Sequence, residues 1–395
     1  MKKRDYRRDT LVTHLGRDPA AHFGAVNPPV FHASTVLYEG VEAYEKRHPE
    51  KGVMTYGRFG TPTTFALQSA IAELQGGADC ICVSSGLAAI TCAILALVEA
   101  GDHILVTDST YYPTRTFCDG ILRKLGVETT YYDPRAGADI AALFRPETRL
   151  VYCESPGSLT FEVQDIPAIA TVAKAADVAL IMDTTWATPI HFKPFDLGVD
   201  IAVEAGTKYV VGHSDVMMGL ITCTPDYEDV VGRTVRELGV TAGPDDVYLA
   251  LRGLRTLTVR LHRHQQTAVA LARWLSQRPE VAQVLYPALP EHPDHELWKR
   301  DFSGASGLFG VVLSQPFSKA AVAAMLDGMA LFGIGSSWGG FESLMIPAYP
   351  EQVRSATTWS APGPLLRIHA GLEDVDDLIA DLEAGFERLN AGQIG

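Results

Sequence analysis

The chain lacks both a long apolar run and an excess of positive charge. No stretch approaches the roughly 20 apolar residues that a membrane-spanning helix requires, and no apolar segment follows the basic N-terminus as it would in a signal peptide. Lys and Arg number 33 against 47 Asp and Glu, a net charge of −14. Binding to a nucleic acid draws on clustered basic side chains, so we expect neither a nucleic-acid nor a membrane partner, and a cytoplasmic location. The one basic cluster is interpreted as a solvated arm: Lys2, Lys3, Arg4, Arg7 and Arg8.

Cysteine is also scarce. The six cysteines include no Cys-x-x-Cys pair, and none has a histidine at zinc-site spacing. Most lie within apolar runs, where free Cys behaves as a small hydrophobic residue, so buried reduced thiols and no metal site are predicted. His262 and His264 suggest a metal-binding pair, but they lie in an Arg-rich helical stretch without nearby carboxylates. A surface position is the better interpretation for both.

Short apolar runs alternate with helical stretches through the middle of the chain. The predicted strands are residues 80–84, 103–107, 128–132, 149–153, 178–182, 201–204 and 216–222, and predicted helices include 87–99, 114–125 and 166–176. This alternation is typical of βαβ units and a mostly parallel sheet. The nearly continuous apolar character of residues 178–182 indicates a sheet covered on both faces.

The two ends of the chain follow other patterns. Residues 1–60 show no sustained periodicity and predict an extended arm, whereas residues 245–277 predict a helix broken near Gly253. Beyond that helix, a different order of elements predicts a smaller α+β domain: strands 308–313 and 365–369, helices 319–325 and 375–389. We therefore divide the chain into an arm (1–60), a larger domain (61–255) and a C-terminal domain (256–395).

Two segments at predicted strand ends suit the binding of a charged ligand. Residues 84–90 form a small, Gly-containing turn between a strand and a helix, and such a turn presents free backbone N–H groups to an anion. A purely structural turn would have the same composition. Asp183 ends the strand 178–182, and ligands of parallel sheets bind at the carboxyl ends of strands. It would either neutralise a ligand cation or cap the loop that follows.

Two further residues suit covalent chemistry and the binding of a flat ring. Lys208 is the one lysine of ten that lies between an apolar strand and an apolar-aromatic tract. A desolvated lysine loses proton affinity and becomes a usable nucleophile and base, although a surface lysine with its stem along apolar atoms would look the same. Tyr111 follows the strand 103–107 and would stack on a ring or pack in the core. Together the four segments meet the needs of pyridoxal 5′-phosphate (PLP).

With these segments in place, the sequence resembles the Cys/Met-metabolism family of PLP enzymes, which contains cystathionine lyases and synthases. The resemblance covers nearly the whole chain and is strongest to the bacterial β-lyases of that family. It also rests on residues 13–17, 56–58, 154–158, 211–215, 337–340 and 367–374. It implies a fold-type I PLP enzyme, with a mostly parallel seven-stranded sheet, helices on both faces and a smaller α+β C-terminal domain.

The resemblance also implies roles for individual residues. Lys208 would carry PLP and move protons, Asp183 would pair with the ring nitrogen, and Tyr111 would stack on the ring and take part in catalysis. The phosphate would be held by Gly86, Leu87 and Thr207, joined by Tyr56 and Arg58 of a neighbouring subunit. Such sharing implies at least a dimer, and the family suggests a tetramer built from two dimers.

The substrate side of the site is implied in the same way. Arg367 and Ser337 would bind the α-carboxylate of an amino acid, a task that suits the planar fork of arginine, although an internal salt bridge would also explain a buried Arg367. Trp338 would form a wall that favours β- over γ-elimination, unless it is simply a core residue. The chain departs from many relatives at Ala205, where they carry Ser and gain a phosphate hydrogen bond.

The resemblance implies β-elimination of L-cystathionine to L-homocysteine, pyruvate and ammonia, as in methionine biosynthesis. Two departures bear on the branch of the family: Thr184 replaces a usual Asn, and Ser158 stands where γ-acting branches carry Asn. The alternatives are a γ-lyase or cysteine desulfhydrase of broader specificity, and a PLP-binding regulatory protein.

Overall fold

The computed structural model describes residues 6–48 and 51–394, so Lys2, Lys3 and Arg4 of the basic cluster lie outside the described residues. Its larger sheet has seven strands in the order β1-β7-β6-β5-β4-β2-β3. Strand β7 runs opposite to the other six strands, which all run in one direction. This confirms a mostly parallel sheet. The strands are β1 Asp79–Val83, β2 His103–Thr107, β3 Glu128–Tyr132, β4 Thr148–Glu154, β5 Ala179–Asp183, β6 Ile201–Glu204 and β7 Gly219–Cys223.

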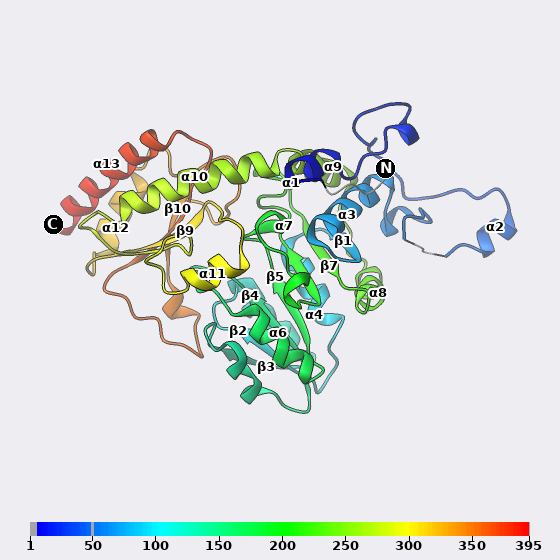
Figure 1. The fold of residues 1–395 in the computed structure, drawn as a ribbon, viewed down its shortest axis with the longest axis horizontal. Coiled ribbons are helices and arrows are strands. Elements are labelled where there is room, and N and C mark those ends of the chain that lie inside the picture. Colours follow the sequence, from blue (N-terminus) through cyan, green and yellow to red (C-terminus); the bar gives the residue numbers. More distant parts are fainter. Residues whose placement is uncertain (1–5, 49–50, 395) are drawn as a thin grey trace.

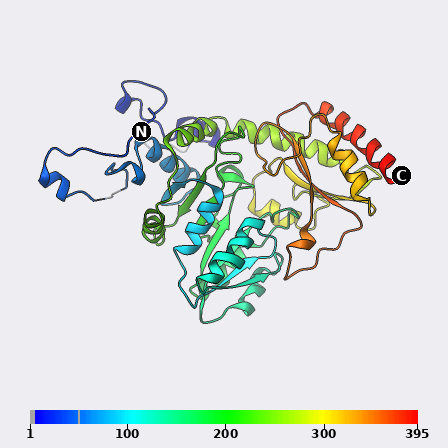
Figure 2. The ribbon, with the colours of Figure 1, turned by 180° about the vertical axis from the view of Figure 1, so that it is seen from behind.

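Helices cover both faces of this sheet because its strands are apolar on both sides. Along β2, Ile104 and Val106 pack in one buried cluster with α4 and α8, whereas Leu105 between them packs in another with α6. Figure 1 shows α6 in front of the sheet, and Figure 2 shows α4 from behind. The helices up to this region are α1 Arg8–His14, α2 Val41–Glu45, α3 Pro62–Gln75, α4 Gly86–Leu95, α5 Tyr112–Phe117, α6 Ile166–Ala175, α7 Thr188–His191 and α8 Glu228–Leu238.

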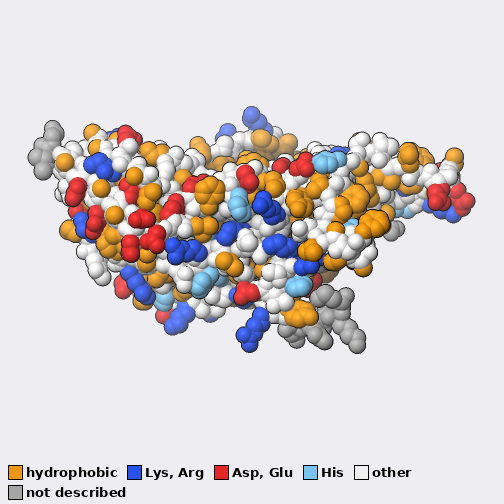
Figure 3. All heavy atoms as spheres, turned by 90° about the horizontal axis from the view of Figure 1, so that it is seen from above, with side chains coloured by type: hydrophobic (Ala, Val, Ile, Leu, Met, Phe, Trp, Pro, Cys, Tyr) orange, Lys and Arg blue, Asp and Glu red, His pale blue; other side chains and the backbone are white. Residues whose placement is uncertain are grey.

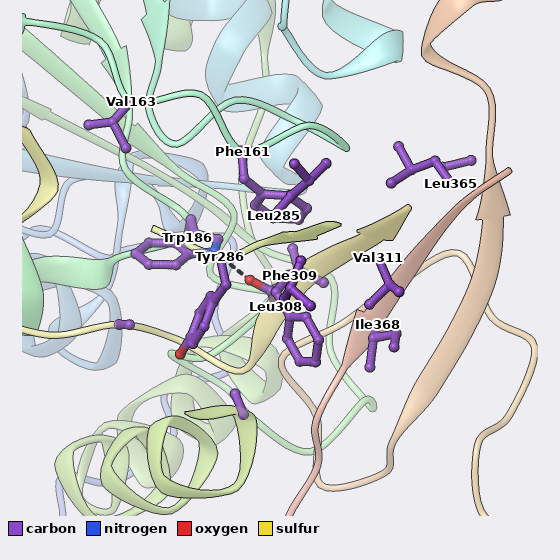
Figure 4. Close-up of a cluster of buried hydrophobic side chains, with 14 of the residues drawn as sticks. Phe161, Val163, Trp186, Leu285, Tyr286, Leu308, Phe309, Val311, Leu365 and Ile368 are labelled. Carbon is purple, nitrogen blue, oxygen red and sulfur yellow. Dashed lines mark hydrogen bonds between the residues drawn. The ribbon is translucent and has the colours of Figure 1, made fainter. Parts of the chain in front are cut away.

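The smaller sheet is antiparallel throughout, in the order β10-β11-β9-β8. Its strands are β8 Val281–Leu285, β9 Leu308–Leu313, β10 Leu344–Ala348 and β11 Leu365–His369, accompanied by α11 His295–Asp301, α12 Lys319–Asp327 and α13 Val375–Ile394. One buried cluster continues from the larger sheet into the smaller one. Figure 4 shows Phe161 and Trp186, from the segments that follow β4 and β5, together with side chains of β8, β9 and β11. Trp186, which follows β5, donates its indole N–H to the carbonyl of Leu308 at 3.0 Å.

The predicted helix break near Gly253 separates α9 Pro244–Leu254 from α10 Leu257–Leu275. A Cβ atom on Gly253 would lie 2.4 Å from the carbonyl oxygens of both Val210 and Val211. Glycine is therefore required here by the close approach of two backbone segments. The long α10 reaches from the cluster around α3 and α9 to the cluster of the smaller sheet. The domain boundary at residue 255 falls between these helices and stays a prediction.

The arm projects from one end of the molecule, and its described residues, 6–48 and 51–60, form only short helices (Figure 1). The prediction of an extended arm misses α1, whose Val12 is fully buried against the body of the protein. Farther along, Phe23 and Leu37 are almost wholly exposed, at 108% and 91%. This part of the chain therefore leaves large apolar side chains without cover from its own fold.

The six cysteines are all free and buried, as predicted. The prediction that both His262 and His264 lie on the surface is wrong for His264. Its ring is fully buried, because α10 turns this position toward the smaller sheet, and Nδ1 lies 2.8 Å from the carbonyl of Ala370. Within residues 6–48 and 51–394, no group of three or more potential ligands is arranged to hold a metal ion. No helix in those ranges is long and apolar enough to cross a membrane.

Candidate active site

A cavity of about 380 Å³ opens at the carboxyl ends of the parallel strands, between the two sheets. All the predicted site residues line it except Tyr56 and Arg58: Gly86, Leu87, Tyr111, Asp183, Thr207, Lys208, Ser337, Trp338 and Arg367. The fold brings them together because each lies at or after a strand end of the larger sheet, on β11, or in the loop that β11 holds. This is the edge at which parallel α/β sheets bind ligands.

The turn between β1 and α4 forms the anion-binding end of the cavity. Ser85 caps α4, its hydroxyl accepting the Ala88 N–H at 3.1 Å, and the N–H groups of the first turn have no acceptor within the helix. A Cβ atom on Gly86 would lie 2.6 Å from the Cβ of Ala205. Glycine and alanine therefore pack directly on each other, and Ala205 offers no hydroxyl to a phosphate.

Thr207 is less free to bind a phosphate than the sequence suggests. Its hydroxyl donates to the carbonyl of Met218 at 3.1 Å and accepts the Met218 N–H at 2.8 Å. These bonds tie the segment that carries Lys208 to the residue before β7. The Thr207 hydroxyl would have to leave the Met218 carbonyl before it could donate to a ligand oxygen.

Asp183 offers a buried negative charge without a cation. Its carboxylate accepts the Thr185 N–H at 2.9 Å and the Tyr152 hydroxyl at 3.5 Å, and burial raises the pKa of Asp183. No Lys, Arg or His of the described residues lies within salt-bridge distance of it. A carboxylate buried in this way is costly until a cation arrives, so Asp183 fits the protonated nitrogen of a pyridine ring.

Glu154 is a second buried carboxylate that reasoning from the sequence did not single out for a role. It ends β4 directly opposite Asp183 on β5 and lines the cavity. Its oxygen accepts the backbone N–H of Tyr111 at 2.6 Å, and burial, together with the charge of Asp183, raises the pKa of Glu154 well above its usual range. The rule that selected Asp183, an acid that ends an apolar strand, would have found Glu154 too.

Lys208 projects into the cavity from the segment between β6 and β7. Its amine donates to the Ser337 hydroxyl at 2.7 Å and lies 5.3 Å from the centre of a Trp338 ring. Burial, assisted by the positive charge of Arg367, lowers the pKa of Lys208 to about 8. About a tenth of the amine is therefore neutral at pH 7, far more than for an ordinary lysine, and able to act as a nucleophile or base.

Arg367 projects from β11 with no carboxylate of the described residues within 4 Å, so the alternative of an internal salt bridge finds no partner there. Its guanidinium donates to the carbonyls of Ser336 at 2.9 Å and Ser337 at 3.2 Å, and burial lowers the pKa of Arg367 to about 10. A charged fork at a cavity wall, held by carbonyls alone, suits an incoming carboxylate.

Tyr111 is the N-cap residue that precedes α5, and it is 44% exposed at the mouth of the cavity. Burial of its hydroxyl, together with the charges of Glu154 and Asp183, raises the pKa of Tyr111, so the phenol stays neutral. Trp338 is half-buried: one side faces the cavity, and its ring centre lies 5.5 Å from that of Tyr209. It therefore belongs both to the core and to the cavity wall.

Tyr56 and Arg58 lie outside this cavity. Arg58 donates to the carbonyl of Arg236 at the end of α8, and Tyr56 is 43% exposed beside Phe59. Within one chain the structure therefore does not bring these two residues together with the rest of the predicted site.

The cavity has the donors and charges that PLP needs. The α4 turn offers N–H groups to a phosphate, Asp183 offers an anion to a ring nitrogen, and Lys208 offers an amine of lowered pKa to an aldehyde. The model of the Cys/Met metabolism PLP-dependent enzyme family matches residues 9–387. The chain belongs to this family. It is a PLP-dependent enzyme, and its cofactor is PLP.

Individual family members are similar over nearly their whole length. The cystathionine beta-lyase MetC of Escherichia coli is 44% identical to this chain, covering 98% of it and 99% of MetC. A protein of Wolbachia pipientis named L-alanine/L-glutamate racemase is 41% identical, covering 97% and 98%. The crystal structure of a cystathionine gamma synthase from Xanthomonas oryzae, in complex with aminoacrylate and cysteine, is 31% identical, with a TM-score of 0.89 over 98% of this chain and 100% of the other.

Proposed function

We propose that this enzyme cleaves L-cystathionine by β-elimination, with the uptake of one water molecule, to L-homocysteine, pyruvate and ammonia. We place the reaction in the cytoplasm and in methionine biosynthesis. The observation that carries the proposal is the combination of Lys208, Arg367 and Trp338 in one cavity of a chain 44% identical to a cystathionine beta-lyase. The substrate is an amino acid, and the guanidinium of Arg367, which is held by carbonyls and not by a carboxylate among the described residues, matches its α-carboxylate.

In this proposal each residue acts on a defined atom. PLP, when bound, withdraws electrons from the substrate Cα and so makes its proton removable. The neutral amine of Lys208 takes that proton, and the Ser337 hydroxyl at 2.7 Å orients the amine. Asp183 holds a proton on the ring nitrogen. The departing sulfur receives a proton from Lys208 or from the neutral phenol of Tyr111.

The proposed assembly of several copies is based on Tyr56 and Arg58, which do not line the cavity of their own chain. We place Tyr56 and Arg58 at the phosphate of a neighbouring copy, which requires at least a dimer and fits a tetramer of two dimers. Figure 3 shows hydrophobic side chains uncovered toward the end of the molecule from which the arm projects. Those of the arm include Phe23, Leu37 and Val41, which contact between copies would bury.

Two further reactions share the first step, the removal of the Cα proton. The similarity to the Wolbachia protein favours racemisation of a small amino acid as a second candidate. γ-Elimination, or a desulfhydrase of broader specificity, additionally needs removal of a Cβ proton and room for the distal arm of the substrate. Trp338 at the cavity wall restricts that room.

Product analysis tests the proposal. Purified enzyme supplied with L-cystathionine should form pyruvate and homocysteine as the main products, and supplied with L-alanine it should form little D-alanine. Dominant 2-oxobutyrate and cysteine would move the chain to the γ-branch, and a D-alanine rate above the pyruvate rate would favour the racemase. The Lys208→Ala enzyme is the matched blank. Absence of every product, with specific capture of a protein partner, would favour a regulatory PLP-binding protein.

A further inference from the structure

Alternate residues of β11 and its extension hold one loop of the cavity wall. This loop, residues 335–343, carries Ser337 and Trp338. At its near end, Arg367 donates to loop carbonyls, as described above. At its far end, Glu373 accepts both the N–H and the hydroxyl of Ser343 at 2.7 and 2.8 Å.

His369 holds the middle of the same loop. Its Nε2 accepts the N–H of Gly339 at 3.1 Å and lies 3.2 Å from the carbonyl of Gly340. Gly339 has a positive φ of +85°, and a Cβ atom there would lie 2.9 Å from the carbonyl carbon of Lys208. The backbone turn that His369 holds is therefore packed directly against the backbone of Lys208.

The burial of His369 has no simple explanation in stability. The ring is 1% exposed, and its Nδ1 has no partner among the described residues. An unpaired buried donor destabilises a fold, and an apolar side chain of similar size would avoid that cost. Burial, together with the neighbouring His264, lowers the pKa of His369 well below its usual range, which keeps the ring neutral and Nε2 able to accept.

We propose that His369 is a positioning residue that holds Ser337 and Trp338 in place at Lys208 while the substrate occupies Arg367. This inference rests on the proposed role of Arg367. Arg367 holds the loop carbonyls through Nη2 alone. If this nitrogen turns to a substrate carboxylate, the near end of the loop loses its side-chain anchor. His369 is then the nearest remaining anchor on β11.

His264 provides a matched control. Its ring is equally buried, its centre lies 5.2 Å from that of His369, and its Nε2 is also unpaired among the described residues. Its hydrogen bond, however, goes to the carbonyl of Ala370 rather than to the loop. His369→Leu and His264→Leu therefore remove equal buried rings, but only the first removes the anchor of the loop.

The first measurement is hydrogen exchange of the backbone amides in residues 336–343 of the holoenzyme. His369→Leu should raise exchange at Gly339 at least tenfold, because this amide loses its acceptor. His264→Leu should leave exchange there unchanged, and His369→Gln, which places an acceptor near the position of Nε2, should restore most of the protection. Equal exchange at Gly339 in the wild type and His369→Leu would refute the anchor whatever reaction the enzyme catalyses.

The second measurement is steady-state kinetics with L-cystathionine. His369→Leu should raise KM about tenfold with a smaller fall in kcat, because the carboxylate-binding end of the site is loosened more than the amine. His369→Gln should recover most of this loss, and His264→Leu should keep a wild-type KM. A KM raised equally by both leucine variants would assign His369 a structural role only. Wild-type enzyme that forms no pyruvate would refute the proposed reaction and the role of His369 in binding this substrate, while the exchange result would still decide the anchor.

Discussion

The cavity and the arm differ in how their polar side chains are held. In the cavity, Lys208 and Asp183 are each fixed by a hydrogen bond within the chain at 2.7 or 2.9 Å. In the arm, Arg58 donates to a carbonyl of α8 and to no other group of the described residues, and Tyr56 remains 43% exposed. Catalytic groups must be held in place before the substrate arrives, so the cavity is built for chemistry by one chain. The arm carries groups whose use we assign to another copy.

The largest effect that we expect is the loss of turnover when Lys208, in the cavity, is replaced. Lys208→Ala should lower turnover by at least about 10⁴-fold, because nucleophile and base vanish together. Borohydride should fix the cofactor to wild-type protein at Lys208, as mass mapping of the adduct would show, and should fix none to the variant. A reduced adduct at any other lysine would contradict the assignment of the site.

The second prediction tests the arm. Arg58→Ala should lower turnover by about 10²-fold through weaker phosphate binding. Hybrids formed by refolding Arg58→Ala with Lys208→Ala chains should exceed both parents, since one cavity in each pair then has Lys208 and receives an intact Arg58 from its neighbour. Refolding each variant alone is the control. Hybrids no more active than the better parent would indicate that Arg58 acts within its own chain.

The third prediction concerns pH, which should change the reactivity of Lys208 in the cavity in the same way whether or not the arm is altered. The lowered pKa of Lys208, about 8, means that its neutral fraction falls about tenfold for each pH unit below 8. Capture of PLP by cofactor-free enzyme should slow accordingly below pH 8 and level off above it. The control is the reaction of PLP with the side-chain amine of free lysine, whose rate should rise with pH up to the ordinary lysine pKa of about 10.4. Arg58→Ala should capture more slowly with the same midpoint, and a shifted midpoint would contradict this expectation.

The smallest effect that we expect is in stability. Leu37 is 91% exposed, so Leu37→Ser should change the unfolding free energy of the isolated chain by less than about 0.5 kcal/mol. If contact between copies buries this side chain, the same change should raise the dissociation constant of the assembly. Sedimentation at several protein concentrations would measure it. Leu67→Ser, at a fully buried position of α3, is the contrast and should destabilise every state. An assembly unaffected by Leu37→Ser would remove this residue from the proposed interface.

Much of the larger sheet could be predicted because its strands are short, apolar and bounded by turns. Strands β2, β3 and β6 begin and end at the predicted residues. The same pattern led to Asp183, since a polar residue directly after an apolar strand is visible in the sequence. Glu154 ends β4 in the same way, but it lies within residues 154–158, whose role the sequence indicates only through the family resemblance.

The smaller sheet was harder to predict from local pattern. Strands β8 and β10 lie at its two edges; β8 has exposed positions such as Gln283, and β10 contains Pro347. Their pairing is set by contact with β9 and β11 rather than by their own composition. The contact of His369 with Gly339 joins residues 30 positions apart, and no periodicity in the sequence reports such a contact. The burial of His264 was missed for the same reason.

The long helix α10 has a consequence for how the molecule melts. Its 19 residues extend about 28 Å at 1.5 Å per residue, and its buried side chains contribute to two clusters, Leu257 and Leu261 to one and Leu271 and Leu275 to the other. Neither sheet can lose its packing without exposing part of this rod. Calorimetry should therefore record one transition in which both sheets melt together, and two well-separated transitions would contradict this coupling.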